Sequence, residues 1–155
     1  MHLRVGVKAI IIRHEKLLVV KKRDGKGVFY SFPGGGQEAG ETLIQAVQRE
    51  MVEETGLEVQ VGNLLFVREY IGKHHENAET EGDLHVVDHL FHCLVEHFPE
   101  TFLAKAPDTG QEEIEWLSLN QLRTCRFYPQ TLIPHLIELG EGRVPSTPVY
   151  VGDIN

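Results

Sequence analysis

The stretch R-E-M-V-E-E-T-G-L, residues 49–57, places three glutamates and an arginine within about two turns of a predicted helix. That helix is expected over residues 42–55. Thr42 and Gln45 match the capping box that starts a helix, and Gly56 matches the glycine that commonly ends one. Whether these glutamates form a solvated surface or a built site depends on the helix face that they occupy.

The glutamates lie on the apolar side of this helix. At about 100° per residue, Glu50 and Glu54 fall inside the apolar arc and Glu53 falls at its edge. The arc is formed by Leu43, Ala46, Val47 and Met51. A purely solvated acidic face would lie opposite these residues. Carboxylates that converge beside a core repel one another and lose hydration, which is costly unless a cation neutralises them.

The expected cation is Mg²⁺ or Mn²⁺, because hard carboxylate oxygens suit these ions and the helix carries no His or Cys for zinc. Arg49 stands four residues before Glu53, so an ion pair that orients this glutamate is also predicted. The preceding Gly34, Gly35 and Gly36 allow the backbone to approach a bound ion or phosphate closely.

Around this helix the chain mixes strands and helices in an order typical of an α/β sandwich with a mixed sheet between helices. Apolar runs at 5–12 and 17–22 predict a hairpin, and the glycine-rich segment 33–41 and the polar segment 72–83 predict loops. Further elements are expected as strands at 28–32, 57–71, 84–98 and 112–119, and as a helix at 129–140. Residues 1–140 are predicted to form one domain. Residues 141–155 are predicted to form a tail that adds a strand or contacts a partner.

Composition narrows the class of protein. The net charge of −8 argues against a general nucleic-acid-binding protein, and a polyphosphate substrate would need a metal cation to bridge it to the site. No segment is long and apolar enough to span a membrane. Cys93 and Cys125 are expected to be reduced thiols, which together with the absence of a signal sequence predicts a cytoplasmic protein.

Residues 35–57 resemble the box of the Nudix hydrolases, a MutT-like family whose pattern is G-x5-E-x7-R-E-U-x-E-E-x-G-U, with U a bulky apolar residue. The fixed positions are all matched, by Gly35, Glu41, Arg49, Glu50, Met51, Glu53, Glu54, Gly56 and Leu57. The resemblance implies the family's α/β/α sandwich. It also implies a magnesium-dependent pyrophosphohydrolase that cleaves the phosphoanhydride bond of a nucleoside diphosphate linked to a group X, through attack of metal-activated water on phosphorus.

The same resemblance assigns roles to single positions. Glu50, Glu53 and Glu54 would be catalytic metal ligands, with Glu50 also a candidate to position or deprotonate water. The carbonyl of Gly34 would be a further ligand. Glu41 and Arg49 would hold the loop and helix in shape, and Gly56 would end the helix.

Residues outside the box are harder to place. Glu112 or Glu113 is a candidate for the additional base or ligand that the family often takes from a later segment, with exposed strand-edge charges as the equal alternative. Gly35, Gly36, Arg23 and Tyr30 are the predicted substrate-binding residues. Phe29, Tyr70 and Tyr128 are further candidates to stack on a base, and Lys22 is an alternative contact for a phosphate.

The substrate is expected to be a small nucleotide, with a nucleoside triphosphate or a modified nucleotide as the first candidate. Dinucleoside polyphosphates and ADP-ribose remain alternatives, as does a nucleotide-sensing module that has lost the chemistry. The protein is expected to be a monomer or a homodimer.

Overall fold

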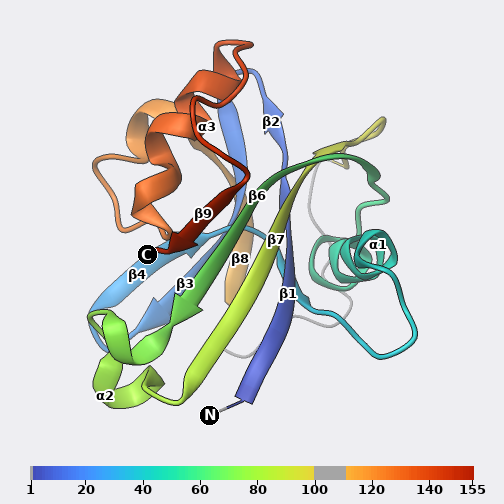
Figure 1. Ribbon diagram of the computed structural model, residues 1–155. Helices are drawn as coiled ribbons and strands as arrows, with labels where there is room; N and C mark the ends of the chain where they lie inside the picture. Colours follow the sequence, from blue (N-terminus) through green and yellow to red (C-terminus); the bar gives the residue numbers. More distant parts are fainter. Residues whose placement is uncertain (1, 100–110) are drawn as a thin grey trace.

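A mixed sheet built around β1 carries the glycine-rich segment and one face of the main cleft. The computed structural model describes residues 2–99 and 111–155. In spatial order the strands of this sheet are β5 (Gly34–Gly36), β1 (His2–Ile10), β7 (Leu84–Leu94), β6 (Gln60–Ile71) and β9 (Tyr150–Asp153). β1 pairs parallel with β7 and antiparallel with β5, and β9 pairs parallel with β6 (Figure 1). The predicted mixed sheet is therefore confirmed.

A second, antiparallel sheet faces the first and is centred on β3. Its strands are β2 (Ile12–Arg13), β3 (Lys16–Asp24), β4 (Gly27–Ser31) and β8 (Gln111–Ser118). β3 pairs with β8 along one edge and with β4 and β2 along the other. Lys21 pairs with both Tyr30 and Glu113, and Leu17 pairs with both Ile12 and Leu117. The α/β sandwich is thus built from two sheets rather than one.

The helices cover opposite sides of these sheets, as Figure 1 shows for α1 and α3. The α-helices are α1 (Leu43–Thr55), α2 (Ala78–Glu81) and α3 (Ile133–Gly140). Short 3₁₀ turns occur at η1 (Gly72–His74), η2 (Leu119–Gln121) and η3 (Gln130–Leu132). Thr42 and Gln45 form the predicted capping box of α1, and Gly56 ends the helix in the left-handed conformation, as predicted.

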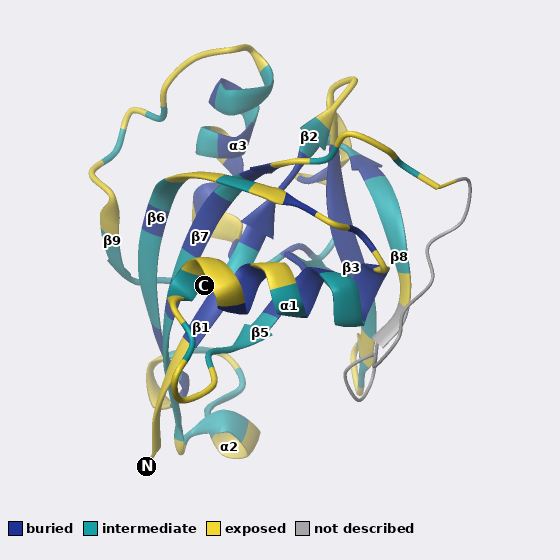
Figure 2. Ribbon diagram, turned by 90° about the vertical axis from the view of Figure 1, so that its right-hand side faces the viewer, coloured by how far each residue is buried: buried dark blue, intermediate teal, exposed yellow. Residues whose placement is uncertain are grey.

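Two apolar clusters form the core. One lies under α1, where Val47 and Met51 pack against Ala9 of β1 and Phe91 of β7. Figure 2 shows the buried side of α1 turned toward the sheet and its exposed side turned outward. The other cluster lies on the side of α3 and includes Phe66. Each fully buried side chain of this kind contributes roughly 1.5–3 kcal/mol of hydrophobic stabilisation, so α1 is fixed to the sheet by its packing.

Three local predictions from the sequence are wrong in whole or in part. The predicted hairpin is present only at its turn, where Ile12 and Arg13 of β2 pair with Leu17 and Lys16 of β3, whereas β1 belongs to the other sheet. The glycines at 34–36 form the strand β5 instead of a loop, since the edge of β1 supplies their hydrogen-bond partners. The segment 72–83 contains η1 and α2 instead of an irregular loop. In the described part of the chain, no helix has the length and apolar character that crossing a membrane requires.

Candidate functional site

The glutamates of α1 are partly enclosed by the fold, as their helical spacing predicts. Glu54 is 1% exposed and Glu50 is 8% exposed, while the side chain of Glu53 is 37% exposed. α1 is held in place by its apolar face, so the carboxylates of Glu50 and Glu54 project from a rigid element toward β5. Two buried negative charges and a third at the edge are costly unless nearby positive charge neutralises them.

Arg49 supplies part of that charge and organises the loop before the helix. Its guanidinium donates to both carboxylate oxygens of Glu41 at 2.7 and 3.1 Å, and to the carbonyl of Gly36 at 2.8 Å. Its Nη1 also lies between Glu50 and Glu53, at 3.0 and 3.2 Å. The hydrogen bonds to Glu41 raise the pKa of Arg49 and lower that of Glu41. The predicted pairing of Arg49 with Glu53 is present, but Glu41 is its strongest partner.

The glycine strand β5 lies directly against the carboxylates. The backbone N–H of Gly34 donates to Glu54 at 3.3 Å. Gly34 has φ of 150°, and a Cβ there would lie 2.0 Å from the carbonyl oxygen of Val7. A Cβ on Gly35 would lie 2.4 Å from the carboxylate of Glu50. Gly34 therefore excludes a side chain, because it meets the backbone of β1, whereas a side chain at Gly35 would displace the carboxylate of Glu50.

This set of donors fits a hard divalent cation. Glu50, Glu53 and Glu54 offer carboxylate oxygens beside the backbone of β5, which is the chemistry that Mg²⁺ and Mn²⁺ prefer. Among residues 2–99 and 111–155, no three acidic, His or Cys side chains are already arranged as a metal site. The guanidinium of Arg49 lies between two of these carboxylates and offsets their mutual repulsion. The donor chemistry therefore suits a cation, although coordination would require these side chains to rearrange.

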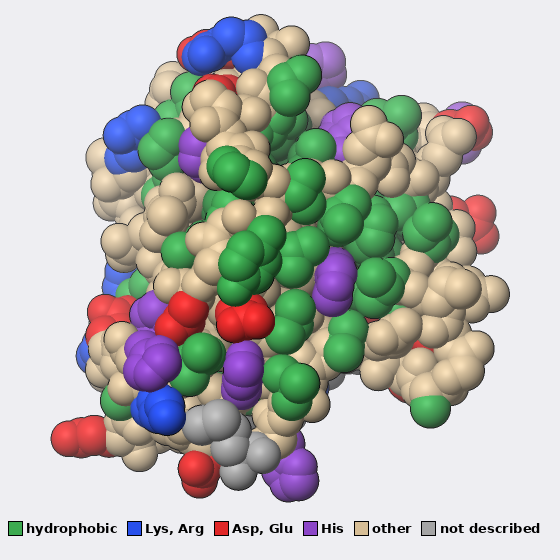
Figure 3. Space-filling view, in the orientation of Figure 1, with side chains coloured by type: hydrophobic (Ala, Val, Ile, Leu, Met, Phe, Trp, Pro, Cys, Tyr) green, Lys and Arg blue, Asp and Glu red, His purple; other side chains and the backbone are tan. Residues whose placement is uncertain are grey.

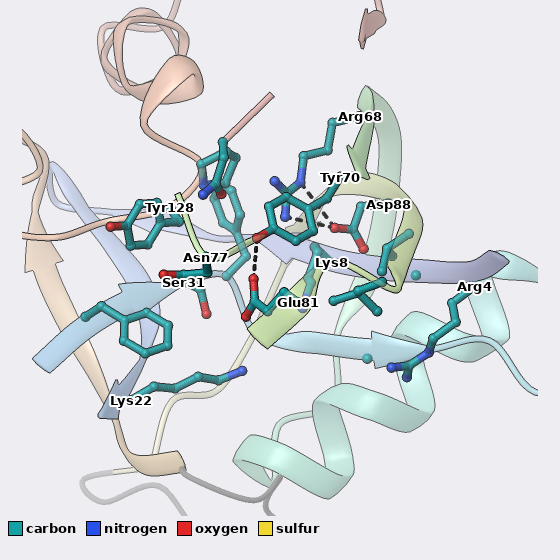
Figure 4. A pocket seen from close by; sticks show the side chains of 18 of the residues that line it. Arg4, Lys8, Lys22, Ser31, Arg68, Tyr70, Asn77, Glu81, Asp88 and Tyr128 are labelled. Atoms are coloured by element: carbon teal, nitrogen blue, oxygen red, sulfur yellow. Dashed lines mark hydrogen bonds and ion pairs between the residues drawn. The ribbon is translucent and has the colours of Figure 1, made fainter. Parts of the chain in front are cut away.

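A cleft of about 660 Å³ opens between the two sheets beside β5 (Figure 4). One wall is formed by β1, β7 and β6 and the opposite wall by Phe29 and Ser31 of β4, with Tyr128 beside them. Tyr128 donates to Glu76 at 2.5 Å, and Lys26 donates to Asn77 at 3.4 Å, so the segment 72–82 is joined to the opposite wall. Gly35 and Gly36 line the cleft as well as the shallow depression beside Glu50 and Glu41.

Basic side chains gather in this cleft although the chain as a whole is acidic. Its basic lining residues are Arg4, Lys8, Lys22, Lys26 and Arg68. Within the described ranges, the side chains of Arg4 and Lys8 have no hydrogen-bond or ion-pair partner, and both belong to β1 next to the glycine strand. Arg68 is bound to the buried carboxylate of Asp88 at 3.2 Å. Positive charge next to the acidic cluster suits a ligand that carries several negative charges.

Two predicted binding residues lie off this cleft. Lys22 and Phe29 are cross-strand partners that both line it, whereas Arg23 and Tyr30 are not among its lining residues. Tyr30 instead packs against the core on the side of α3. Successive side chains of a strand point to opposite faces, so a shift of one residue exchanges the two sets. Lys22 and Phe29 therefore replace Arg23 and Tyr30 as the lining residues.

The later acidic candidate is not brought to the carboxylate cluster. Glu113 of β8 is half-exposed and pairs with Lys21 at 3.0 Å. Its neighbour Ile114 packs toward α1, so by strand alternation Glu113 points to the opposite face. The side chain of Glu112 lies outside the described residues. Arg4, Lys8, Arg68 and Asp88 were not predicted from the sequence, because only the pairing of β1, β7 and β6 places them side by side.

Comparison with known proteins decides the family. The family model described as NUDIX domain matches residues 2–136, which is most of the chain. The chain belongs to the Nudix family. A relative from Enterobacter sp. (strain 638), named nucleoside triphosphatase NudI, is 30% identical over 142 residues, covering 86% of this chain and 100% of the relative. Gly35 to Leu57 are thus the Nudix box of a Nudix domain.

Other Nudix proteins are similar over different shares of their length. A protein of Methanocaldococcus jannaschii named ADP-ribose pyrophosphatase is 45% identical over 69 residues, which cover 43% of this chain and 40% of that protein. The match therefore spans less than half of this relative. A solved structure of a NUDIX hydrolase from Nitrosomonas europaea has a TM-score of 0.70 at 25% identity, covering 94% of each chain.

Proposed function

We propose that this Nudix protein hydrolyses a phosphoanhydride bond in a small nucleotide, with water attacking phosphorus and a divalent cation required. The observation that carries the proposal is the position of the buried Glu50 and Glu54, which lie against the glycine strand whose Gly35 and Gly36 line a basic cleft. Buried carboxylates provide sites for the cation, and the basic side chains bind the phosphates that the acidic cluster would repel.

The roles of the residues follow from their places. Glu50, Glu53, Glu54 and the carbonyl of Gly34 would hold the cation, which is Mg²⁺ or Mn²⁺. When bound, such a cation neutralises phosphate charge and makes phosphorus more susceptible to attack. Arg49 bridges Glu50 and Glu53, and its bonds to Glu41 and to the carbonyl of Gly36 tie the preceding loop to α1.

Glu50 remains the residue proposed to orient or deprotonate the attacking water. Its carboxylate lies between the guanidinium of Arg49 and the backbone of Gly35, so its position is constrained from two sides.

The basic residues of β1 are proposed to bind the phosphates. Arg4 and Lys8 are adjacent to the glycine strand in the sheet, and Gly6 between them pairs with Gly36. A phosphate chain placed along β5 would reach these cations and the carboxylate cluster together. Phe29 and Tyr128, on the opposite wall, are the proposed partners of the base, since aromatic side chains stack on nucleobases of any sequence.

A nucleoside triphosphate is the first candidate substrate, since the relative that is matched over its whole length is named a nucleoside triphosphatase. ADP-ribose is the second candidate, because the relative named ADP-ribose pyrophosphatase is 45% identical to this chain over 69 residues. The alternative of a nucleotide sensor without activity receives no support from the box, which keeps each of its glutamates and its arginine.

The test is a panel of nucleoside triphosphates, modified nucleotides, ADP-ribose and dinucleoside polyphosphates incubated with Mg²⁺ in ¹⁸O-labelled water. We expect cleavage between phosphates, label on a phosphate product, and loss of activity when a chelator removes the cation. Activity that persists under exhaustive chelation, or label that enters a sugar carbon, would contradict the proposal. A protein that binds nucleotides but turns none over would support the sensor.

A further inference from the structure

The segment after α3 returns across the molecule although it lies beyond the residues that the family model matches. That match ends at residue 136, yet β9 pairs parallel with β6 through Val67, Arg68 and Glu69. The backbone N–H of Ile154 donates to the carbonyl of Glu69 at 3.1 Å. Ile154 also packs against the apolar core on the side of α3. The segment is therefore integrated into the fold.

Asp153 fastens this segment to the turn that follows β6. Its carboxylate accepts the backbone N–H of Ile71 at 3.0 Å, and it contacts Nδ1 of His74 at 2.8 Å and Nε2 of His75 at 2.6 Å. Partial burial opposes ionisation of Asp153, but the bonds from His75 and His74 outweigh it and hold its pKa at about 2. Figure 3 shows histidine and acidic side chains gathered on this face, where β6 meets η1. His75 in turn stacks on Tyr70, a lining residue of the cleft.

The next residues reach the cleft itself. The carbonyl of Ile154 accepts a hydrogen bond from Nη1 of Arg68 at 2.9 Å, and Nε of Arg68 donates to Asp88 at 3.2 Å. The guanidinium is thus held between a backbone oxygen of the returning segment and a buried carboxylate, and Figure 4 shows Arg68 and Asp88 turned toward each other at the cleft wall. Asn155 also lines the cleft. Residues 153–155 consequently position Arg68 and support Tyr70.

The register of the sheet places these residues at the far end of the cleft from the glycine strand. One row of paired residues runs straight across the strands as Gly36, Gly6, Asp88, Arg68 and Gly152. At about 4.8 Å per strand, the backbone of Arg68 lies roughly 14 Å from the glycine strand along this row, and its guanidinium reaches back one strand to Asp88. If the phosphates lie at the glycine end, beside Arg4 and the carboxylates, the other end receives the nucleoside.

We propose that Asp153, Ile154 and Asn155 form a positioning segment for the nucleoside end of the substrate, by fixing Arg68 from one side and Tyr70 from the other. The proposal rests on the proposed function for the identity of the ligand as a nucleotide. It assigns the segment to substrate affinity and base preference, and it leaves bond cleavage to the residues around β5 and α1. The three residues are positioning residues, apart from the contact that Asn155 itself makes with the cleft.

The test compares Asp153→Ala with Glu141→Ala, a matched loss of one carboxylate from the same segment. Glu141 is exposed and its side chain pairs only with Arg143 among the described residues. With the best substrate of the panel, Asp153→Ala should raise KM roughly ten-fold, the effect of losing hydrogen bonds to a charged group. Its kcat should stay within about two-fold of wild type, since the groups at the reacting phosphates are untouched. Glu141→Ala should leave both constants unchanged.

Binding of products separates the two ends of the cleft without any turnover. Calorimetric titration with AMP, GMP, CMP and UMP should show weaker binding to Asp153→Ala, whereas titration with inorganic pyrophosphate and Mg²⁺ should show unchanged binding. If the wild type hydrolyses no nucleotide, the proposed function fails, but these titrations still test the positioning segment. Equal loss of monophosphate and pyrophosphate binding would overturn the inference, as would a fall in kcat at unchanged KM.

A loss of folding in Asp153→Ala would not settle the question, so Asp153→Asn serves as the second variant. The asparagine keeps the size of the side chain and one oxygen that can still accept the N–H of Ile71, and it loses the negative charge and one of the two oxygens that hold the imidazoles. Its melting temperature should lie near that of wild type, with a smaller rise of KM in the same direction. If Asp153→Asn is well folded and its monophosphate affinities equal those of wild type, the inference is refuted.

Discussion

Replacing Gly35 by alanine should inactivate the enzyme through a displacement of Glu50. The new Cβ would lie 2.4 Å from the carboxylate of Glu50, and ordinary van der Waals contact begins at 3.4 Å. The carboxylate must therefore retreat by about 1 Å, which the flexible side chain of Glu50 allows while α1 and β5 stay in place. A displacement of this size at a catalytic group costs about 100-fold in rate, which corresponds to roughly 2.7 kcal/mol of transition-state stabilisation.

The neighbouring glycine provides the comparison. A Cβ on Gly36 would meet only Nη2 of Arg4 at 3.5 Å and the carbonyl of Val5 at 4.0 Å, so Gly36→Ala leaves Glu50 in place. Steady-state kinetics at saturating Mg²⁺ should give a kcat for Gly36→Ala at least about ten-fold above that of Gly35→Ala. Thermal melts of both variants would show whether the fold is kept. A well-folded Gly35→Ala with kcat close to wild type would refute the reasoning, because the position of Glu50 would then be irrelevant to catalysis.

Three further outcomes follow from the charges. Without metal, the melting temperature of Glu54→Gln should be no lower than that of wild type, because the substitution relieves repulsion between carboxylates. Added Mg²⁺ should raise its melting temperature less than that of wild type, and its turnover should be lower by orders of magnitude. A metal-free melt clearly below wild type with activity kept would instead show a structural glutamate. Arg49→Lys should lower the free energy of unfolding by about 1–3 kcal/mol in chemical denaturation, since lysine cannot replace the two-pronged contact with Glu41; an unchanged denaturation midpoint would contradict this. The hydrogen bonds from Arg126 hold the pKa of Asp24 at about 2, below its ordinary 3.8, so the stability from this pair is complete above pH 3.8 and is lost as the pH falls to about 2. Arg126→Gln should remove that part of the acid dependence of the melting temperature, and an unaltered acid profile would count against it.

The helix and its glutamates were predictable because their information is local. The capping box at Thr42, the terminating Gly56 and the spacing of Glu50 and Glu54 relative to the apolar arc depend on residues a few positions apart. Helical phase alone therefore predicted that two acidic side chains are buried. The partners of Arg49 were predicted only in part, since Glu41 lies eight residues away in a loop whose path depends on β5.

The walls of the cleft could not be derived in the same way. Whether Lys22 or Arg23 lines the cleft, and whether Phe29 or Tyr30 does, is set by one register between β3 and β4. Both strands present apolar or basic side chains at each parity, so the sequence offers no contrast that would fix the face. The pairing of Asp88 with Arg68 depends in turn on the antiparallel alignment of β6 and β7, which joins residues 20 positions apart.

Long-range pairing also explains the errors in the loops. Three consecutive glycines carry little strand propensity, and β5 exists because β1 offers it an unpaired edge. The segment 72–83 lacks apolar periodicity, yet Gly72 allows the carbonyl of Glu81 to approach it so closely that a Cβ would clash at 1.7 Å. That contact folds the segment back on itself, and it cannot be predicted from the pattern of neighbouring residues.

The two edges of the mixed sheet, β5 and β9, differ in how many sequence changes they can accept. The edge at β5 is constrained at two of its three residues, because a side chain at Gly34 would meet the backbone of β1 and one at Gly35 would displace Glu50. The edge at β9 is joined to the sheet by few pairs, and the chain that leads to it, residues 141–149, is mostly exposed. Insertions and substitutions there would alter the pocket's far wall without moving the carboxylates. For an enzyme engineer, this edge is the place to graft sequence from other Nudix proteins when a new nucleoside preference is wanted.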